Sequence, residues 1–231
     1  MNLSWIERSE INEVIHVYIE YGEKEIEYLK SRDKKLGAAI DEIGYIERPI
    51  NEDLFSSVIN HIVGQQISTA AQKTVWNRLN NKLTTIDAES LLALDRDELQ
   101  SIGISFRKAE YMLDFADKVH SGEFDIEALN HMNDEEVIQA LSSLRGIGVW
   151  TAKMLMSFSM KRPDIVSFGD LAIIRGMRML YRHRKIDKEK FNKYRKRYSP
   201  YGTVASLYLW EISGGAIPGL TDPAPKKVKI K

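Results

Sequence analysis

One ten-residue segment, LRGIGVWTAK at residues 144–153, constrains this chain more than any other feature. Two glycines, Gly146 and Gly148, interrupt a sequence that is otherwise suited to helices. Glycine adopts backbone conformations that other residues avoid, and a helix that restarts directly after such a turn has unpaired amide groups at its N-terminus. We therefore predict a tight helix-hairpin-helix whose amides bind a phosphate group.

A carboxylate follows this hairpin closely, in the segment FGD at residues 168–170. Negative charge near a phosphate weakens the binding of nucleic acid, so Asp170 needs a chemical reason to be there. We predict that Asp170 takes part in chemistry on a nucleotide. The structural alternative is an N-cap of the helix that starts at Leu171, and the two roles are compatible because a cap fixes the side-chain rotamer.

The charge of the chain is balanced but unevenly distributed. Lys and Arg total 33, as do Asp and Glu, so the formal net charge is zero. Between residues 175 and 197, however, basic residues far outnumber the two acidic ones, Asp187 and Glu189. This stretch is expected to follow DNA phosphates, with a solvated helix face as the alternative. The basic C-terminal tail, residues 223–231, is expected to add nonspecific affinity.

Composition excludes several kinds of site. The chain has no cysteine, which rules out disulfides and cysteine-ligated iron–sulfur clusters, and its five histidines lack metal-ligand spacing. We expect no catalytic metal. Residues 1–12 are charged and lack an apolar core, and no apolar run is long enough to span a membrane. A soluble cytoplasmic protein is expected, associated with the nucleoid if it is bacterial.

Hydrophobic periodicity predicts helices along most of the chain. Apolar residues recur at helical spacing in 55–63, in 67–79 after a break near Gly64, and in 105–120. Capping boxes are expected at Asp95 with Glu98 and at Asn133 with Glu136. Only a short piece within 14–18 alternates like a strand. The fold is expected to be all-α, with two lobes that share a face.

Four segments together resemble one known family. They are IVGQQIS at 62–68, LRGIGVWTAKM at 144–154, FGDLAIIRG at 168–176 and LYLWEISG at 207–214. Their order and spacing are similar to the helix-hairpin-helix DNA glycosylase superfamily, and within it to the 3-methyladenine DNA glycosylase II branch. The resemblance implies two helical lobes with a cleft between them. One lobe is expected from residues 1–54 and 165–231, and the other from 55–164 with the hairpin at 137–160.

The resemblance also implies a base excision repair enzyme that flips a damaged nucleotide into the cleft. Asp170 matches the catalytic aspartate, which stabilises positive charge on the deoxyribose or orients the attacking water. The hairpin matches the DNA-binding turn, and from it Arg145, Gly146, Gly148, Thr151 and Lys153 are expected to contact DNA. No cofactor is required, although the family commonly holds Na⁺ or K⁺ at turn carbonyls, here those of Leu144 and Ile147.

Trp150 distinguishes between two mechanisms. Relatives that also cleave the strand carry a lysine here, whose amine forms a Schiff base with the sugar. A tryptophan therefore predicts a monofunctional glycosylase that leaves an abasic site. Trp150, Trp210 and Met154 are expected to bind the base, with the indole faces attracting a cationic alkylated purine. Met156 and Phe158 are expected in the core.

The segment around Gln65 and Gln66 matches the part of the family that reaches into DNA. Gln66 is a candidate to fill the gap left by the flipped nucleotide and Gln65 to read the opposite base. Exposed amides at a helix start are the structural alternative. The expected partner is duplex DNA bound by a monomer. Two other functions stay open: a glycosylase of the same superfamily for oxidised or deaminated bases, and a noncatalytic hairpin that only binds DNA.

Overall fold

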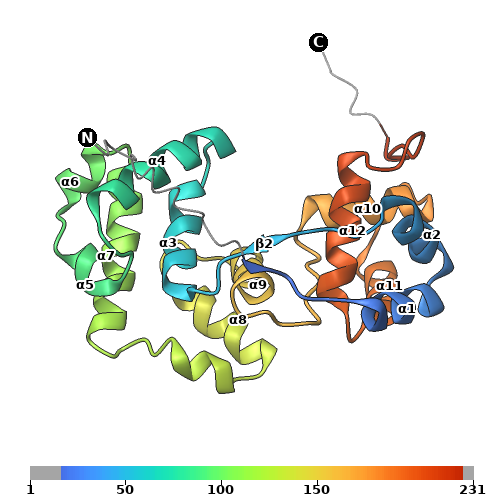
Figure 1. Cartoon of the computed structure of the whole chain (residues 1–231), viewed down its shortest axis with the longest axis horizontal. Coiled ribbons are helices and arrows are strands. Elements are labelled where there is room, and N and C mark those ends of the chain that lie inside the picture. The colour runs from blue at the N-terminus through green and yellow to red at the C-terminus, as the bar shows by residue number, and fades with distance from the viewer. Residues whose placement is uncertain (1–16, 226–231) are drawn as a thin grey trace, which may run out of the picture.

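The protein is described by a computed structural model, which covers residues 17–225 (Figure 1). Helices dominate this part of the chain, which confirms the predicted all-α class. In chain order the elements are β1 (Val17–Tyr18), α1 (Glu23–Arg32), α2 (Lys34–Ile43), β2 (Pro49–Ile50), α3 (Leu54–Gly64), α4 (Thr69–Lys82), α5 (Ala88–Leu92), α6 (Arg96–Ser101), α7 (Phe106–His120), the 3-10 helix η1 (Glu127–His131), α8 (Asp134–Ser143), α9 (Val149–Phe158), α10 (Leu171–Tyr181), α11 (Lys188–Tyr198) and α12 (Gly202–Gly214).

Local sequence signals account for many helix boundaries. The Asp95 and Asn133 side chains accept from the amides of Glu98 and Glu136, whose carboxylates accept from the cap amides in return. Both predicted capping boxes are thus confirmed. The predicted break near Gly64 is the end of α3, and Ser68 caps the start of α4. The only sheet among the described residues pairs β1 with β2 in antiparallel fashion, with Val17 opposite Ile50. Residues 14–16 of the expected strand and 226–231 of the basic tail lie outside the described part.

The apolar core consists of two clusters. One gathers side chains from α3 to α9 and ends at Ile165. The other contains Val166 and side chains of α10, α11 and α12, and these pack against α1 and α2 near the start of the described chain. Figure 1 shows the same arrangement, with α3 to α9 in one half and α1, α2 and α10 to α12 in the other. The two-lobe domain boundaries drawn from the sequence stay a prediction, since the clusters describe only which apolar side chains pack together.

A close helix crossing positions the site. At Gly176 of α10 a Cβ atom would lie 2.2 Å from the carbonyl oxygen of Leu209 in α12, so only glycine allows this approach. Trp210 is the residue after Leu209 in α12, and the crossing brings it beside the N-terminus of α10. None of the helices within residues 17–225 has the length and apolar character needed to cross a membrane.

Candidate active site

Asp170 is the N-cap of α10 and is buried, with 5% of its surface exposed. Its Oδ1 accepts hydrogen bonds from the backbone amides of Ala172 and Ile173, both at 2.9 Å. These are two of the amides that the start of a helix leaves unpaired. The cap predicted as the structural role of Asp170 is present, and it fixes the direction of the second carboxylate oxygen.

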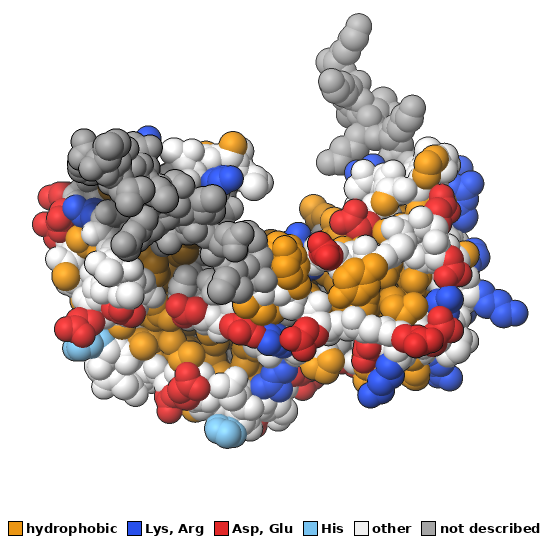
Figure 2. All heavy atoms as spheres, viewed as in Figure 1, with side chains coloured by type: hydrophobic (Ala, Val, Ile, Leu, Met, Phe, Trp, Pro, Cys, Tyr) orange, Lys and Arg blue, Asp and Glu red, His pale blue; other side chains and the backbone are white. Residues whose placement is uncertain are grey.

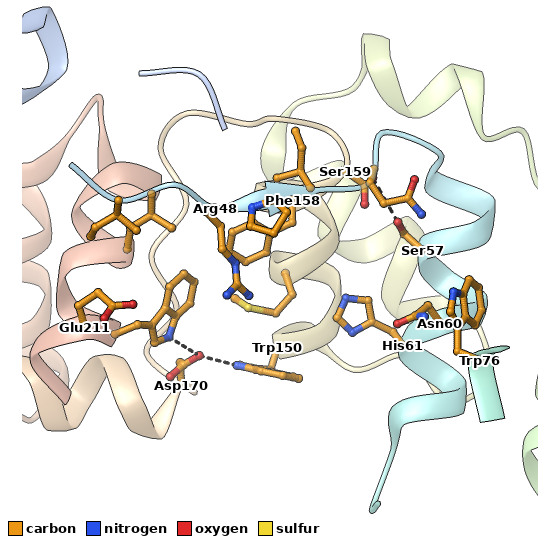
Figure 3. Close-up of a pocket in the computed structure, with 17 residues that line it drawn as sticks. Arg48, Ser57, Asn60, His61, Trp76, Trp150, Phe158, Ser159, Asp170 and Glu211 are labelled. Carbon is orange, nitrogen blue, oxygen red and sulfur yellow. Dashed lines mark hydrogen bonds between the residues drawn. The ribbon is translucent and has the colours of Figure 1, made fainter. Parts of the chain in front are cut away.

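That second oxygen, Oδ2, faces two tryptophans (Figure 3). The Trp150 indole Nε1 donates to it at 2.8 Å and the Trp210 Nε1 donates at 3.2 Å. The structure therefore brings together Asp170, Trp150 and Trp210, which lie far apart in the sequence. We expected these indoles to offer their faces to a base, and reasoning from sequence missed that their N–H edges bind the carboxylate.

The hydrogen bonds fill the carboxylate. A carboxylate has about four lone-pair sites, and here four N–H groups donate to it. No Lys or Arg forms an ion pair with Asp170 in residues 17–225. Its negative charge is thus held by neutral dipoles, which leaves it available to a cation that develops nearby.

A cavity of about 560 Å³ opens beside Asp170. It lies between the two core clusters, since α3, α4 and α9 line one side and α12 with the chain before and within β2 lines another. The lining residues are Ile46, Arg48, Pro49, Ile50, Asn51, Ser57, Asn60, His61, Trp76, Trp150, Met154, Phe158, Ser159, Asp170, Leu207, Trp210 and Glu211. Trp150, Trp210 and Met154 all line this cavity, as a base-binding role for them requires.

Phe158 corrects one expectation. We placed it in the core, but its ring lines the cavity, 5.5 Å from the Trp210 ring centroid. The spacing along α9 indicates this position, because Phe158 follows Met154 by four residues and Trp150 by eight and therefore lies on the same helix face. Met156, on another face, is fully buried as expected.

Arg48 and His61 are cavity residues that the sequence did not indicate. The Arg48 guanidinium lies 5.0 Å from the Phe158 ring centroid, in cation–π geometry. His61 is the residue just before the glutamine-containing segment, and burial lowers its pKa below the ordinary value. The imidazole is therefore neutral at neutral pH. In Figure 3 it points from α3 into the space opposite Asp170 and Trp150.

The predicted hairpin is formed by α8, the turn at 144–148 and α9. Gly146 has φ +85°, a left-handed conformation, and a Cβ atom there would lie 2.4 Å from the Tyr111 ring. Gly148 caps α9 without a side-chain hydrogen bond, so the first amides of α9 are free of a local acceptor. Both observations fit a turn in which backbone amides face a ligand.

The glutamine segment is joined to this turn. The Gln65 side-chain amide donates to the Gly146 carbonyl at 2.7 Å. Gln66 is exposed and has φ +58°, which is uncommon for a residue other than glycine. Of the two candidates, Gln65 is thus bound to the hairpin turn, whereas the exposed Gln66 side chain forms no hydrogen bond within residues 17–225.

The other predicted DNA contacts have different surroundings. Arg145 is exposed, with its guanidinium 5.5 Å from the Tyr111 ring centroid. Thr151 is half-buried in the first turn of α9. The Lys153 ammonium donates to the Val166 carbonyl at 3.3 Å, and burial lowers its pKa. Lys153 does not line the cavity beside Asp170.

Several members of the basic stretch at 175–197 are engaged within the protein. Arg178 pairs with Asp222, Arg195 with Asp164, and Arg197 with Asp33. Figure 2 shows Lys and Arg gathered along the outer edge of the half that contains α10 to α12. The stretch therefore offers fewer unpaired charges to DNA than its composition indicates. Residues 17–225 contain no cluster of His, Asp or Glu that fits a metal ion.

Known DNA repair proteins are similar to this chain in sequence and in fold. Residues 59–200 match the model of the HhH-GPD superfamily base excision DNA repair proteins. DNA-3-methyladenine glycosylase 1 of Schizosaccharomyces pombe is 30% identical over 164 residues, which are 69% of this chain and 72% of that protein. The crystal structure of a DNA-3-methyladenine glycosidase from Bacillus halodurans superposes with a TM-score of 0.77 at 32% identity, over 86% of this chain and 93% of that one. A 3-methyladenine DNA glycosylase of S. pombe, solved in complex with abasic DNA, superposes with a TM-score of 0.67 at 27% identity, over 81% of this chain and 95% of that one.

Proposed function

Because the chain belongs to the HhH-GPD superfamily of base excision DNA repair proteins, we propose that it is a DNA N-glycosylase that removes alkylated purines from duplex DNA. The relatives named above are 3-methyladenine glycosylases, which supports this substrate class. The single observation that carries the proposal is the buried Asp170 carboxylate at the edge of a cavity lined by aromatic rings.

Asp170 stabilises the positive charge that builds on the deoxyribose as the N-glycosidic bond breaks. A buried anion held by fixed N–H dipoles needs no reorganisation when that charge appears. The same four hydrogen bonds argue against Asp170 as the group that orients the attacking water, since an indole would have to release Oδ2 before the carboxylate could accept from a water molecule. Of the two roles considered for Asp170, charge stabilisation is therefore the better supported.

The reaction stops at an abasic site. Strand cleavage by this family needs an amine at the sugar, and position 150 carries an indole instead. The nearest lysine along α9 is Lys153, whose ammonium is bound to the Val166 carbonyl. We infer a monofunctional enzyme.

The hairpin binds the backbone of the damaged strand. The free amides at the start of α9 hold one phosphate, Arg145 and Thr151 lie beside them, and Gln66 fills the space left by the flipped nucleotide. A monovalent cation fits the turn: the Leu144 carbonyl accepts only from Ile147 and keeps one lone pair, and the Ile147 carbonyl is its proposed second ligand. The proposed enzyme works as a monomer without another cofactor.

The test is base release from methylated duplex DNA by the wild type and Asp170→Asn, with strand breaks scored before and after hot alkali. We expect release by the wild type alone, and breaks only after alkali. Loss of one such electrostatic group costs about 10²–10³-fold in rate. DNA affinity of the variant should be equal or slightly higher, because a negative charge is removed. Breaks without alkali would contradict the monofunctional mechanism, and release from oxidised or deaminated DNA alone would identify the alternative substrate class.

A further inference from the structure

Arg48 is the cationic side chain of the cavity, and its hydrogen-bonding groups are unused. It precedes β2, and its guanidinium lies over the Phe158 ring at 5.0 Å. Within residues 17–225 the Arg48 side chain forms no hydrogen bond and no ion pair. A guanidinium carries five N–H donors, all of which are therefore available to a ligand in the cavity.

The direction of the side chain is held by aromatic packing. Phe158 contacts both the Arg48 guanidinium and the Trp210 ring, and Trp210 donates to Asp170. Arg48 and Asp170 are thus connected through the Phe158 and Trp210 rings, which contact each other at a tilt of 36°. Figure 3 shows the guanidinium pointing from the β2 side toward Asp170 and Trp150.

A flipped purine has a defined orientation in such a cavity. Its glycosidic nitrogen must lie at Asp170, where the bond breaks, so its six-membered ring extends away from Asp170 into the cavity that Arg48 also lines. The substituent at position 6 of the purine distinguishes the possible ligands. A 6-oxo group accepts hydrogen bonds from arginine, whereas a 6-amino group is itself a donor and cannot accept one from the guanidinium.

The charge of Arg48 acts independently of this recognition. Two acidic residues, the buried Asp170 and the exposed Glu211, also line the cavity, while His61 is neutral at neutral pH. A cationic base is repelled by Arg48 and attracted by the two carboxylates. Charge therefore discriminates less between bases at this site than the donor or acceptor at position 6.

We propose that Arg48 is a specificity-determining residue that selects 6-oxopurines, such as hypoxanthine and 7-methylguanine, over the 6-aminopurine 3-methyladenine. This inference rests on the proposed glycosylase function and extends its substrates from alkylated purines to the deaminated base hypoxanthine.

Single-turnover excision with three bases in one duplex context tests the proposal. Hypoxanthine is neutral with a 6-oxo group, 7-methylguanine is cationic with a 6-oxo group, and 3-methyladenine is cationic with a 6-amino group. Arg48→Met should lower excision of both 6-oxopurines at least about tenfold and leave 3-methyladenine unchanged or faster. Arg32→Met is the control, since Arg32 is exposed on α1 and does not line the cavity.

Two outcomes would overturn the proposal. An equal fall for all three bases would make Arg48 a phosphate contact. A rise for both cationic bases without a change for hypoxanthine would reduce its role to charge.

A binding measurement separates this inference from the glycosylase proposal. Free hypoxanthine and free adenine differ at position 6, and each can be titrated into the protein while tryptophan fluorescence is followed, because Trp150 and Trp210 line the cavity. We expect tighter binding of hypoxanthine to the wild type and loss of that preference in Arg48→Met. If the wild type excised none of the three bases, the proposed function would fail, and this titration would still decide the role of Arg48. Equal binding of the two bases by the wild type would refute the proposed specificity role of Arg48.

Discussion

Replacing Trp210 by Phe should destabilise the wild type but not the Asp170→Asn variant. In the wild type the Trp210 Nε1 donates to a buried carboxylate oxygen at 3.2 Å. A hydrogen bond to a charged group contributes about 1.5–3 kcal/mol to stability. Phe fills most of the same space and keeps a ring against Phe158, so most of the expected cost comes from the lost donor.

The Asp170→Asn background reverses the sign of that effect. An amide has one acceptor oxygen and one donor nitrogen, and the Asp170 site presents two backbone donors on one side and two indole donors on the other. If the amide oxygen faces the backbone, the amide nitrogen meets both indole N–H groups. Removing one indole donor then relieves a repulsive contact, so Trp210→Phe should be neutral or stabilising.

The measurement is a double-mutant cycle on the free energy of unfolding, obtained from urea denaturation of the four proteins. We expect a coupling energy of at least about 1.5 kcal/mol between positions 170 and 210. Trp150→Phe is the internal comparison: Trp150 is 45% exposed, so water replaces its donor and the effect should stay below about 1 kcal/mol. Equal effects of Trp210→Phe in both backgrounds would refute the account of Asp170 as an acceptor for indole N–H groups.

Two further predictions concern the hairpin and the cavity histidine. Gly146→Ala should lower the urea midpoint, because Gly146 has a left-handed φ and a Cβ atom there would clash with the Tyr111 ring. Gly148→Ala should keep the urea midpoint, because Gly148 has φ −99° and no atom lies within 4 Å of the new Cβ, but it should weaken DNA binding in a fluorescence-anisotropy titration. Unchanged DNA affinity of Gly148→Ala would argue against a phosphate at the turn. The pKa of His61 is lowered in the folded state, so the unfolded chain binds a proton that the folded chain does not. As the pH falls from about 7.5 to about 5.5, the free energy of unfolding of the wild type should therefore decrease more steeply than that of His61→Gln. Parallel curves would show that the imidazole is not held neutral.

The parts of the site that sequence reasoning found are the parts that local sequence determines. The hairpin follows from two glycines within five residues, and the cap at Asp170 follows from its place before an apolar helix. The position of Phe158 in the cavity could also be predicted from the sequence, because its spacing from Trp150 and Met154 places all three on one face of α9. It was assigned to the core because apolar side chains on a helix usually are.

Arg48 and His61 were not predictable in the same way. Each faces the cavity only because α3 and the chain before β2 pack across from α9 and α12. The overestimate of the basic stretch has a similar origin. Composition counts charges, but Asp33, Asp164 and Asp222, which neutralise Arg197, Arg195 and Arg178, lie in other elements.

Trp150 connects the two halves of the proposed reaction. Its backbone belongs to the first turn of α9, whose free amides we propose as the phosphate site, and its indole N–H donates to Asp170. The proposed phosphate site at the turn and the carboxylate beside the cavity are therefore both positioned by Trp150. DNA that docks on the hairpin is thereby placed at a fixed offset from the charge that stabilises bond breakage. This explains how a buried anion is compatible with a DNA-binding surface: the Asp170 carboxylate is only 5% exposed, and two backbone amides and two indole N–H groups hold its charge within the protein.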